Sequence, residues 1–188
     1  MTDTLPDQFT RACNELESAC RALDPGQLDQ VIHEIAGAKR VVLFGVGREG
    51  LMMRALAMRL YHMGLDAHVV GDMSTPPVGP GDLLIVSAGP GGFSTVNGLL
   101  GVAKAAGART VCVTAQPDGD APLASDVVLT IPAQTMADDQ SPDPASILPM
   151  GSLFEGAQYL VFEVLILHLR DHLGVDPEAM RARHTNLE

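Results

Sequence analysis

The chain has 188 residues, of which 46% are hydrophobic, and its formal net charge is −11. This length and composition predict one globular domain, residues 1–188, with a full hydrophobic core. The negative charge and the aromatic content of 4% argue against nucleic acid as a partner. We expect no membrane partner, because the sequence shows neither an apolar run of transmembrane length nor a signal-peptide pattern. Three cysteines without metal-ligand spacing indicate free thiols, a cytoplasmic location and no metal site.

The chain begins with two predicted amphipathic helices, over residues 6–22 and 25–38, which are separated by a break at Asp24-Pro25-Gly26. Both helices precede the first predicted strand. We expect residues 1–38 to pack on the core that follows.

Strands and helices then alternate along the chain. The expected strands are RVVLFGV, AHVVG, LLIVSAG, TVCVTA and VVLTIP, and the expected helices are 48–63, 93–106, 152–173 and a short one after Asp176-Pro177. This alternation predicts an α/β fold with a parallel sheet that helices cover on both faces.

Two connections, residues 71–82 and 133–151, are longer than is usual in a compact domain. A connection of this kind is either a functional lid or a disordered segment. The second one leads directly into the apolar helix, which favours a lid.

The first strand ends in a glycine-rich turn, RVVLFGVGREG over residues 40–50, and a helix follows at once. Gly45 and Gly47 allow the chain to turn and a ligand to approach the backbone. The unpaired N–H groups at the helix N-terminus can then bind an anion. The spacing does not match the full dinucleotide fingerprint, and similar loops occur without any ligand. By itself the turn indicates only a candidate site for a small anion.

A second candidate anion site is the loop SAGPGGFST, residues 87–95, which also precedes a helix. Strand ends at 45–50, 71–77 and 87–95 all carry unusual loops, and strand carboxyl ends border the ligand crevice in a doubly wound sheet. The alternative is a flexible strand-to-helix connection. Two such loops in one sheet favour a ligand site.

Two carboxylates lie in the long apolar helix. Ser152-x-x-Glu155 has the pattern of a capping box, in which Glu155 need only bond the backbone N–H of Ser152. Capping is the simpler role for Glu155, and catalysis is the alternative. Glu163 lies two turns further on, close to the same helical face, and is either paired, at a subunit interface, or a tuned base.

Two of the six histidines have a context that could indicate function. His62 is near the end of the helix that follows the first glycine turn, where the helix dipole favours a cation. His184 lies in the polar tail, where fraying is the simpler expectation. The other four, which we expect at the surface or at helix ends, are His33, His68, His168 and His172.

Taken together, these stretches resemble the sugar isomerase (SIS) domain, and they are most similar to the 6-phospho-3-hexuloisomerase family. They run in the family's order from residue 45 to the C-terminus. The matching stretches are GVGREG, AMRLYHMGLDAHVVGD with the following STPP, GDLLIVSAG, LASDVVLTIPAQT, ILPMGSLFE and RARHTNLE.

The resemblance implies a three-layer α/β/α fold with a five-stranded parallel sheet of flavodoxin-like type. It also implies a homo-oligomer, a tetramer or a dimer, with sites near subunit boundaries. The implied reaction is aldose–ketose isomerisation, between 3-hexulose 6-phosphate and fructose 6-phosphate, through a cis-enediol. Glu155 would be the general base, and His184 would handle ring opening or a proton, with His62 as a further catalytic residue. The partner would be a small sugar phosphate, with no metal or organic cofactor.

The first departure from the family pattern is Glu49, which stands where the first glycine loop normally ends with a serine. A carboxylate beside a phosphate costs affinity. Therefore Glu49 points away, or Arg48 compensates for its charge, or the ligand is not the usual phosphosugar.

The second departure is in the phosphate loop, which in the family is of the Ser-Gly-Ser-Gly-Glu-Thr type. Here only Ser87 remains, and Gly89 and Gly92 stand where Ser and Thr would be. We expect Ser87 and the backbone N–H groups of Gly91, Gly92 and Phe93 to hold an anion. The remaining expected substrate contacts are Gly45, Gly47, Arg48, Gly89, Ser94 and Thr95.

The expected function is that of a phosphosugar isomerase with a shifted substrate preference. Two alternatives remain open. One is a non-catalytic regulatory SIS domain that binds a sugar or a sugar phosphate, and the other is an isomerase of a different sugar.

Overall fold

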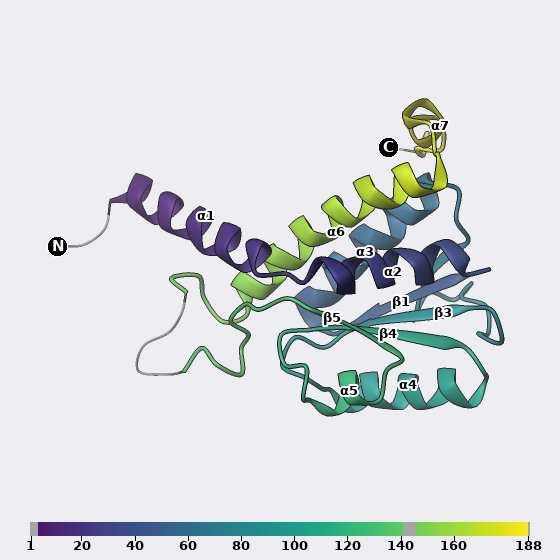
Figure 1. Cartoon of the computed structure of the whole chain (residues 1–188), viewed down its shortest axis with the longest axis horizontal. Coiled ribbons are helices and arrows are strands. Elements are labelled where there is room, and N and C mark those ends of the chain that lie inside the picture. Colours follow the sequence, from purple (N-terminus) through teal and green to yellow (C-terminus); the bar gives the residue numbers. More distant parts are fainter. Residues whose placement is uncertain (1–3, 141–145, 188) are drawn as a thin grey trace.

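The computed structural model describes residues 4–140 and 146–187 and shows three layers, with a sheet between two groups of helices (Figure 1). The α/β/α fold predicted from the sequence is confirmed. The predicted elements are present, with bounds that differ by at most two residues at each end. A four-residue helix, α5 (Asp120–Leu123), is the one element of the described residues that the sequence analysis missed.

The central layer is a sheet of five parallel strands in the order β2-β1-β3-β4-β5. The strands are β1 (Val41–Gly45), β2 (Ala67–Val69), β3 (Leu83–Ser87), β4 (Arg109–Thr114) and β5 (Val127–Thr130). From β1 the chain proceeds to β2 on one side and then to β3 on the other. The strand order therefore reverses between β1 and β3, and in such sheets ligands bind outside the carboxyl ends of the strands at this point.

Helices cover both faces of the sheet (Figure 1). One face carries α2 (Pro25–Gly37), α3 (Gly47–His62) and α6 (Ser152–Leu173), and the other carries α4 (Ser94–Ala105) and α5. Successive strand residues alternate between the two cores, so that Leu43 packs on the α3 side and Val42 on the α4 side.

The two ends of the chain extend from this body (Figure 1). α1 (Leu5–Arg21) contacts α6, and α7 (Pro177–Ala182) contacts α3. The side chain of Asp176 accepts a hydrogen bond from the backbone N–H of Glu178 and so caps α7, as the sequence predicted.

Two glycines set how closely the first turn of α3 lies against β1. A Cβ atom at Gly50 would be 2.5 Å from the carbonyl oxygen of Gly45, and one at Gly45 would be 2.9 Å from the nitrogen of Gly50. Gly47 has a φ of 58° and supplies the left-handed residue of the turn. Gly45 therefore serves close backbone packing, whereas the sequence analysis assigned it to ligand approach.

By length and composition, α6 could cross a membrane, and no other helix of the described residues could. The expectation of no such run was therefore wrong. α6 packs against α1, α2 and α3, and Phe154 and Leu165 on it are fully buried. These contacts account for much of its apolar character, since half of its apolar window is buried in the fold.

Candidate functional site

A cavity of about 350 Å³ lies outside the carboxyl end of β1, in the crevice where the strand order reverses. Its volume is within the range of about 300–1,000 Å³ that is usual for small-molecule sites. The lining residues are Val46, Gly47, Arg48, Glu49, Phe93, Thr135, Met136, Pro149, Met150, Gly151, Ser152, Phe154 and Glu155.

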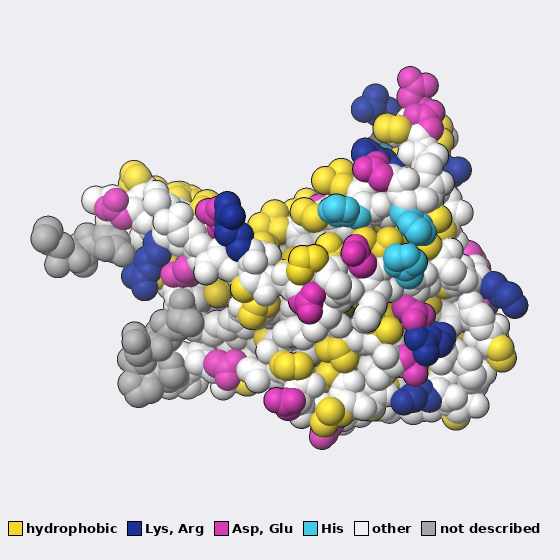
Figure 2. Space-filling model, viewed as in Figure 1, with side chains coloured by type: hydrophobic (Ala, Val, Ile, Leu, Met, Phe, Trp, Pro, Cys, Tyr) yellow, Lys and Arg dark blue, Asp and Glu magenta, His cyan; other side chains and the backbone are white. Residues whose placement is uncertain are grey.

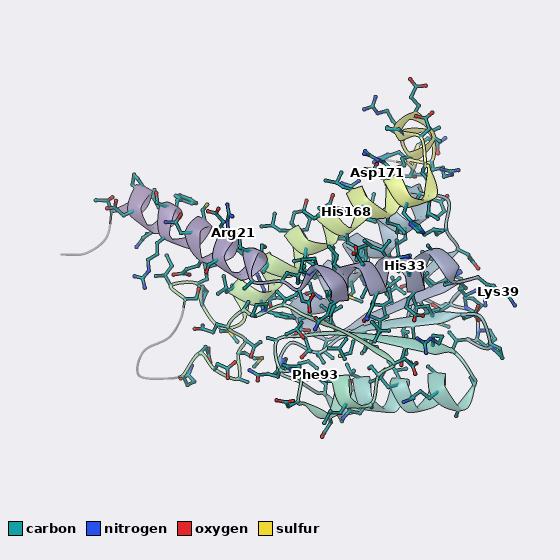
Figure 3. The ribbon with its side chains drawn as sticks, viewed as in Figure 1. Arg21, His33, Lys39, Phe93, His168 and Asp171 are labelled. Carbon is teal, nitrogen blue, oxygen red and sulfur yellow. The ribbon has the colours of Figure 1, made fainter. Side chains whose placement is uncertain are left out.

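The N-terminal ends of three helices line this cavity. Residues 47–49 open α3, Phe93 is the N-cap of α4 (Figure 3), and Ser152 opens α6. None of these three helices has a side-chain cap, whereas α1, α2 and α7 are each capped by a side chain. At the start of α6, the N–H groups of Ser152 and Phe154 donate to the carbonyl oxygens of Pro149 and Gln134. The remaining N–H groups of the three helix ends and the positive ends of the helix dipoles favour an anion. The cavity is therefore suited to a negatively charged ligand, although the chain as a whole is acidic.

Arg48 and Glu155 form an ion pair at this cavity. The Arg48 Nε donates a hydrogen bond to Glu155 Oε2 over 2.5 Å. The Arg48 side chain is 70% exposed and that of Glu155 is 14% exposed. Arg48 is therefore the exposed member of the pair and is accessible to a ligand in the cavity.

The predicted capping box at the start of α6 is not formed, and that interpretation of Glu155 was wrong. The N-cap is Gly151, without any side-chain cap, and Ser152 is already the first helical residue. Met150, just before the cap, has a φ of 55°, which is unusual for a residue with a side chain. The turn at 150–151 moves the helix start by one residue and leaves the Glu155 carboxylate to pair with Arg48.

Glu49 lies beneath this pair and is only 8% exposed. Its Oε2 accepts a hydrogen bond from the Ser87 hydroxyl over 2.5 Å and one from the Gly89 N–H over 2.9 Å. Gln158 on α6 donates from Nε2 to the Ser87 Oγ over 2.8 Å. Ser87 was expected to hold a ligand anion and Gly89 to contact the substrate, but both hold the carboxylate of Glu49.

Burial raises the pKa of Glu49 above its ordinary value. The hydrogen bonds from Ser87 and Gly89 lower the pKa, and the charge of Glu155 raises it, with a rise as the net result. The site therefore contains two carboxyl groups in different surroundings.

The remainder of the 87–95 loop is arranged differently from the expectation. The N–H of Gly91 donates to the carbonyl oxygen of Ala88, so it is used inside the turn. Gly91 has a φ of 91° and packs against Gly119. Of this loop and the first turn of α4, only Phe93 lines the cavity, while Ser94 and Thr95 are exposed.

The long connection after β5 contributes to the cavity from both of its described ends. Thr135 and Met136 come from one end, and Pro149 and Met150 from the other. Residues 141–145 of the predicted lid lie outside the described residues. The 71–77 loop is not brought to this cavity, because it borders a separate one of about 340 Å³ beside α3 and β2.

His62 and His184 are brought together, but away from the cavity. Their rings stack with centroids 5.3 Å apart, and His62 is only 4% exposed. Arg183 fixes the tail by donating to the carbonyl oxygen of His62 over 3.1 Å. His62 ends α3 and Arg48 begins it, so the pair lies about 20 Å from Arg48 along the helix.

Of the other histidines, His33, His168 and His172 are exposed as expected, and histidines cluster on the face shown in Figure 2. His68 is half-buried and contacts Asp66. Within residues 4–140 and 146–187, no group of three His, Cys, Asp or Glu residues is arranged to hold a metal ion.

The cavity thus contains four of the residues predicted from the sequence, namely Gly47, Arg48, Phe93 and Glu155. Ser87 and Gly89 lie behind Glu49. Sequence reasoning treated Glu49 only as an obstacle and missed Gln158, which is completely buried in the apolar helix. The available signal was the presence of a polar amide in that apolar run.

A family model and individual proteins of known sequence both match this chain. The model of the SIS domain matches residues 34–150. A 3-hexulose-6-phosphate isomerase of Mycobacterium gastri is 38% identical over 99% of this chain and 92% of its own length. The enzyme of the same name from Bacillus subtilis is 34% identical over 93% of this chain and 94% of its own length.

A solved structure supports the same relationship. A protein of Methanococcus jannaschii, for which a molecular function of 3-hexulose-6-phosphate isomerase was inferred, superposes with a TM-score of 0.82 and 27% identity. The match covers 96% of this chain and 98% of that one.

Proposed function

The chain belongs to the SIS domain family and is an isomerase related to 3-hexulose-6-phosphate isomerases, and we propose that it moves a carbonyl group between neighbouring carbons of a sugar phosphate. We propose the 3-hexulose 6-phosphate and fructose 6-phosphate pair as the first substrates to test. Both are ketoses, so the carbonyl shift between C3 and C2 describes the reaction better than the aldose–ketose interconversion expected from the sequence.

The observation that carries this proposal is the convergence of three uncapped helix N-termini on one cavity beside Arg48. Backbone N–H groups at such ends bind phosphate without the hydroxyl side chains that this chain lacks. The guanidinium of Arg48 can form a bidentate contact with the same group. A phosphate would then sit at the N-terminal ends, with the sugar chain extending towards Glu155.

Glu155 is the proposed base. Its carboxylate would take the proton from the carbon next to the carbonyl, giving a cis-enediol, and would return it one carbon along. The loss of the capping box supports this role, because Glu155 has no competing hydrogen bond to the helix N-terminus. When a ligand draws Arg48 away, the carboxylate becomes available to the substrate.

We further propose a cytoplasmic homo-oligomer, as a tetramer or a dimer. α6 exposes a row of large apolar side chains, and hydrophobic side chains also gather near α1 and α6 in Figure 2. The exposed large apolar residues of α6 are Tyr159, Leu160, Val164, Leu167 and Leu173. Within one chain, the His62 and His184 pair lies far from the cavity. In an assembly, this pair would serve the cavity of another subunit.

The test is a panel of ketose and aldose phosphates, with the unphosphorylated sugars alongside. Proton NMR in D₂O follows both product formation and exchange of the carbon-bound proton with solvent. We expect turnover of a sugar phosphate with solvent exchange, and no turnover of the unphosphorylated counterpart. Binding without turnover or exchange would instead support a regulatory sugar-binding domain.

The regulatory alternative has one supporting observation, namely that Glu49 already occupies the hydroxyl of Ser87 and the N–H of Gly89. A protein that only binds a sugar does not need a base in the cavity. The position of Glu155 therefore favours the enzyme.

A further inference from the structure

The carboxyl group of Glu49 is held by one of its two oxygen atoms. Oε2 accepts both hydrogen bonds, from the Ser87 hydroxyl and from the Gly89 N–H. Gln158 Nε2 donates to the Ser87 Oγ, so the Ser87 hydroxyl proton is directed towards Glu49. Both donors come from β3 and its loop, which belong to the rigid core of the sheet.

The other oxygen, Oε1, receives no hydrogen bond from the described residues and is not among their fully buried unpartnered atoms. Glu49 also lines the cavity. Because Oε2 already accepts two hydrogen bonds, a proton on the neutral acid belongs on Oε1. In that form Glu49 can donate a hydrogen bond to a ligand in the cavity.

Because Oε1 is not fully buried and Glu49 lines the cavity, this oxygen can find a hydrogen-bond partner in the cavity, and the fold need not supply one. Gly89 leaves room for the group, since a Cβ at this position would be 2.9 Å from Glu49 Oε1. The arrangement fixes the carboxyl group from behind and leaves one oxygen for a partner that is not part of the chain.

We propose that Glu49 is a second catalytic residue, which moves the proton between the two substrate oxygens while Glu155 moves the proton between the two carbons. This inference rests on the proposed isomerase function. It assigns proton transfer to Glu49, at the position where the family pattern has a serine.

The proton transfers balance as follows. Glu155 removes the proton from the carbon that bears the hydroxyl group, and neutral Glu49 donates its proton to the carbonyl oxygen, which gives the enediol and a Glu49 carboxylate. Glu49 then takes the proton of the original hydroxyl group as the new carbonyl forms. Glu155 returns its proton to the neighbouring carbon, and both carboxyl groups are restored.

This role requires that Glu49 is neutral when Glu155 is ionised. The pKa of Glu49 is raised by burial, and the charge of Glu155 raises it further. The other charged or titratable groups near it are Arg48, on its own helix, and Cys112 on β4, whose pKa is raised to about 12 mainly by its burial. Cys112 is therefore a neutral thiol, which leaves the two carboxyl groups as the acid and base of the site.

The test compares Glu49→Gln with the parent protein and with Glu163→Gln, a carboxylate on α6 outside the cavity that pairs with Arg59. Glutamine can accept the hydrogen bonds from Ser87 and Gly89 but cannot transfer a proton. We expect kcat to fall by about a hundredfold or more in Glu49→Gln. In the parent, kcat/KM should also decline at high pH as Glu49 loses its proton, and that alkaline decline should be absent from the residual activity of Glu49→Gln.

A second variant tests the same group without removing it. Ser87→Ala deletes a hydrogen bond that lowers the pKa of Glu49, so the alkaline decline should move to higher pH. If Glu49→Gln does not fold, the Ser87→Ala measurement tests the proposal by itself. An alkaline decline in kcat/KM at the same pH as in the parent would then overturn the proposal.

A Glu49→Gln enzyme with kcat within threefold of the parent and an unchanged alkaline decline would also overturn it. In that case the proposed function stands, provided that the parent is active and Glu155→Gln is not. If the parent itself shows no isomerisation or exchange, the proposed function fails, and the role of Glu49 fails with it.

Discussion

The guanidinium of Arg48 lies 2.5 Å from the carboxylate of Glu155, and this ion pair joins the first turn of α3 to the first turn of α6. The same two helices carry a second pair, Arg59 and Glu163, whose charged atoms are 3.2 Å apart. The first pair lines the cavity and the second does not. The two pairs therefore provide matched variants that separate catalysis from helix packing.

Replacing Glu155 with Gln should lower the turnover of a sugar phosphate by about a hundredfold or more, because the amide cannot accept the carbon-bound proton. The free energy of unfolding should change by about 1 kcal/mol or less, since the residue forms no capping box and its partner is exposed. Steady-state kinetics and urea denaturation measure the two effects.

The control is Glu163→Gln, for which we expect a larger effect on stability than on rate. Full activity in Glu155→Gln together with inactivity in Glu163→Gln would show that the wrong carboxylate has been assigned.

Inorganic phosphate should raise the melting temperature of the protein through the uncapped helix ends at the cavity. Arg48→Gln should weaken phosphate binding by about tenfold, equivalent to about 1.4 kcal/mol. Thermal melting at constant ionic strength, with phosphate replaced by chloride, measures the effect. Arg59→Gln should respond to phosphate as the parent does, and an equal loss in both variants would contradict a site at Arg48.

Gly50→Ala should destabilise the fold by about 1–3 kcal/mol, because the new Cβ would be 2.5 Å from the carbonyl oxygen of Gly45. The matched control is Gly98→Ala in α4, where a Cβ meets no atom within 4 Å. That change should stabilise the protein by about 0.5–1 kcal/mol, as expected for Gly to Ala inside a helix. Urea denaturation gives both values, and a neutral Gly50→Ala would mean that α3 can move away from β1.

The raised pKa of Glu49 predicts a pH-dependent stability. As the pH rises from the unfolded-state pKa towards the folded-state pKa, Glu49 ionises in the unfolded chain but not in the fold, so its contribution to stability falls. In Glu49→Gln, which has no ionisable group at this position, this decrease in the free energy of unfolding is absent. Its stability relative to the parent should therefore be higher at pH 7 than at pH 4, as measured by denaturation at both values. A constant difference between the two proteins would show that the Glu49 pKa is not raised.

Truncation after Ala182 should leave the melting temperature nearly unchanged and remove activity. The tail contacts the end of α3 through Arg183 and His184, and it supplies one of the two stacked histidines. The matched control is His172→Gln, which breaks the other histidine ring contact, to His33, and should retain activity. Full activity of the truncated protein would remove His184 from the mechanism.

The sequence alone determined the fold class, because a strand or helix that packs on one core carries a short-range hydrophobic period. The five strands, the long apolar helix and the α7 cap at Asp176 were all predicted from local patterns. Glycine-rich turns at strand ends also indicated on which edge of the sheet the cavity would lie, since parallel strands bring their carboxyl ends to one edge.

Only the tertiary structure decided which groups meet in the cavity. Ser152 and Glu155 satisfy the capping pattern, but the turn at Met150 and Gly151 moves the helix start, and Glu155 pairs with a residue more than a hundred positions away. Ser87 hydrogen-bonds Glu49, which is 38 positions away in the sequence. Side-chain partners of this kind depend on how helices and strands are placed around the sheet. No local pattern encodes that placement, because the partners come close only when the whole core is packed.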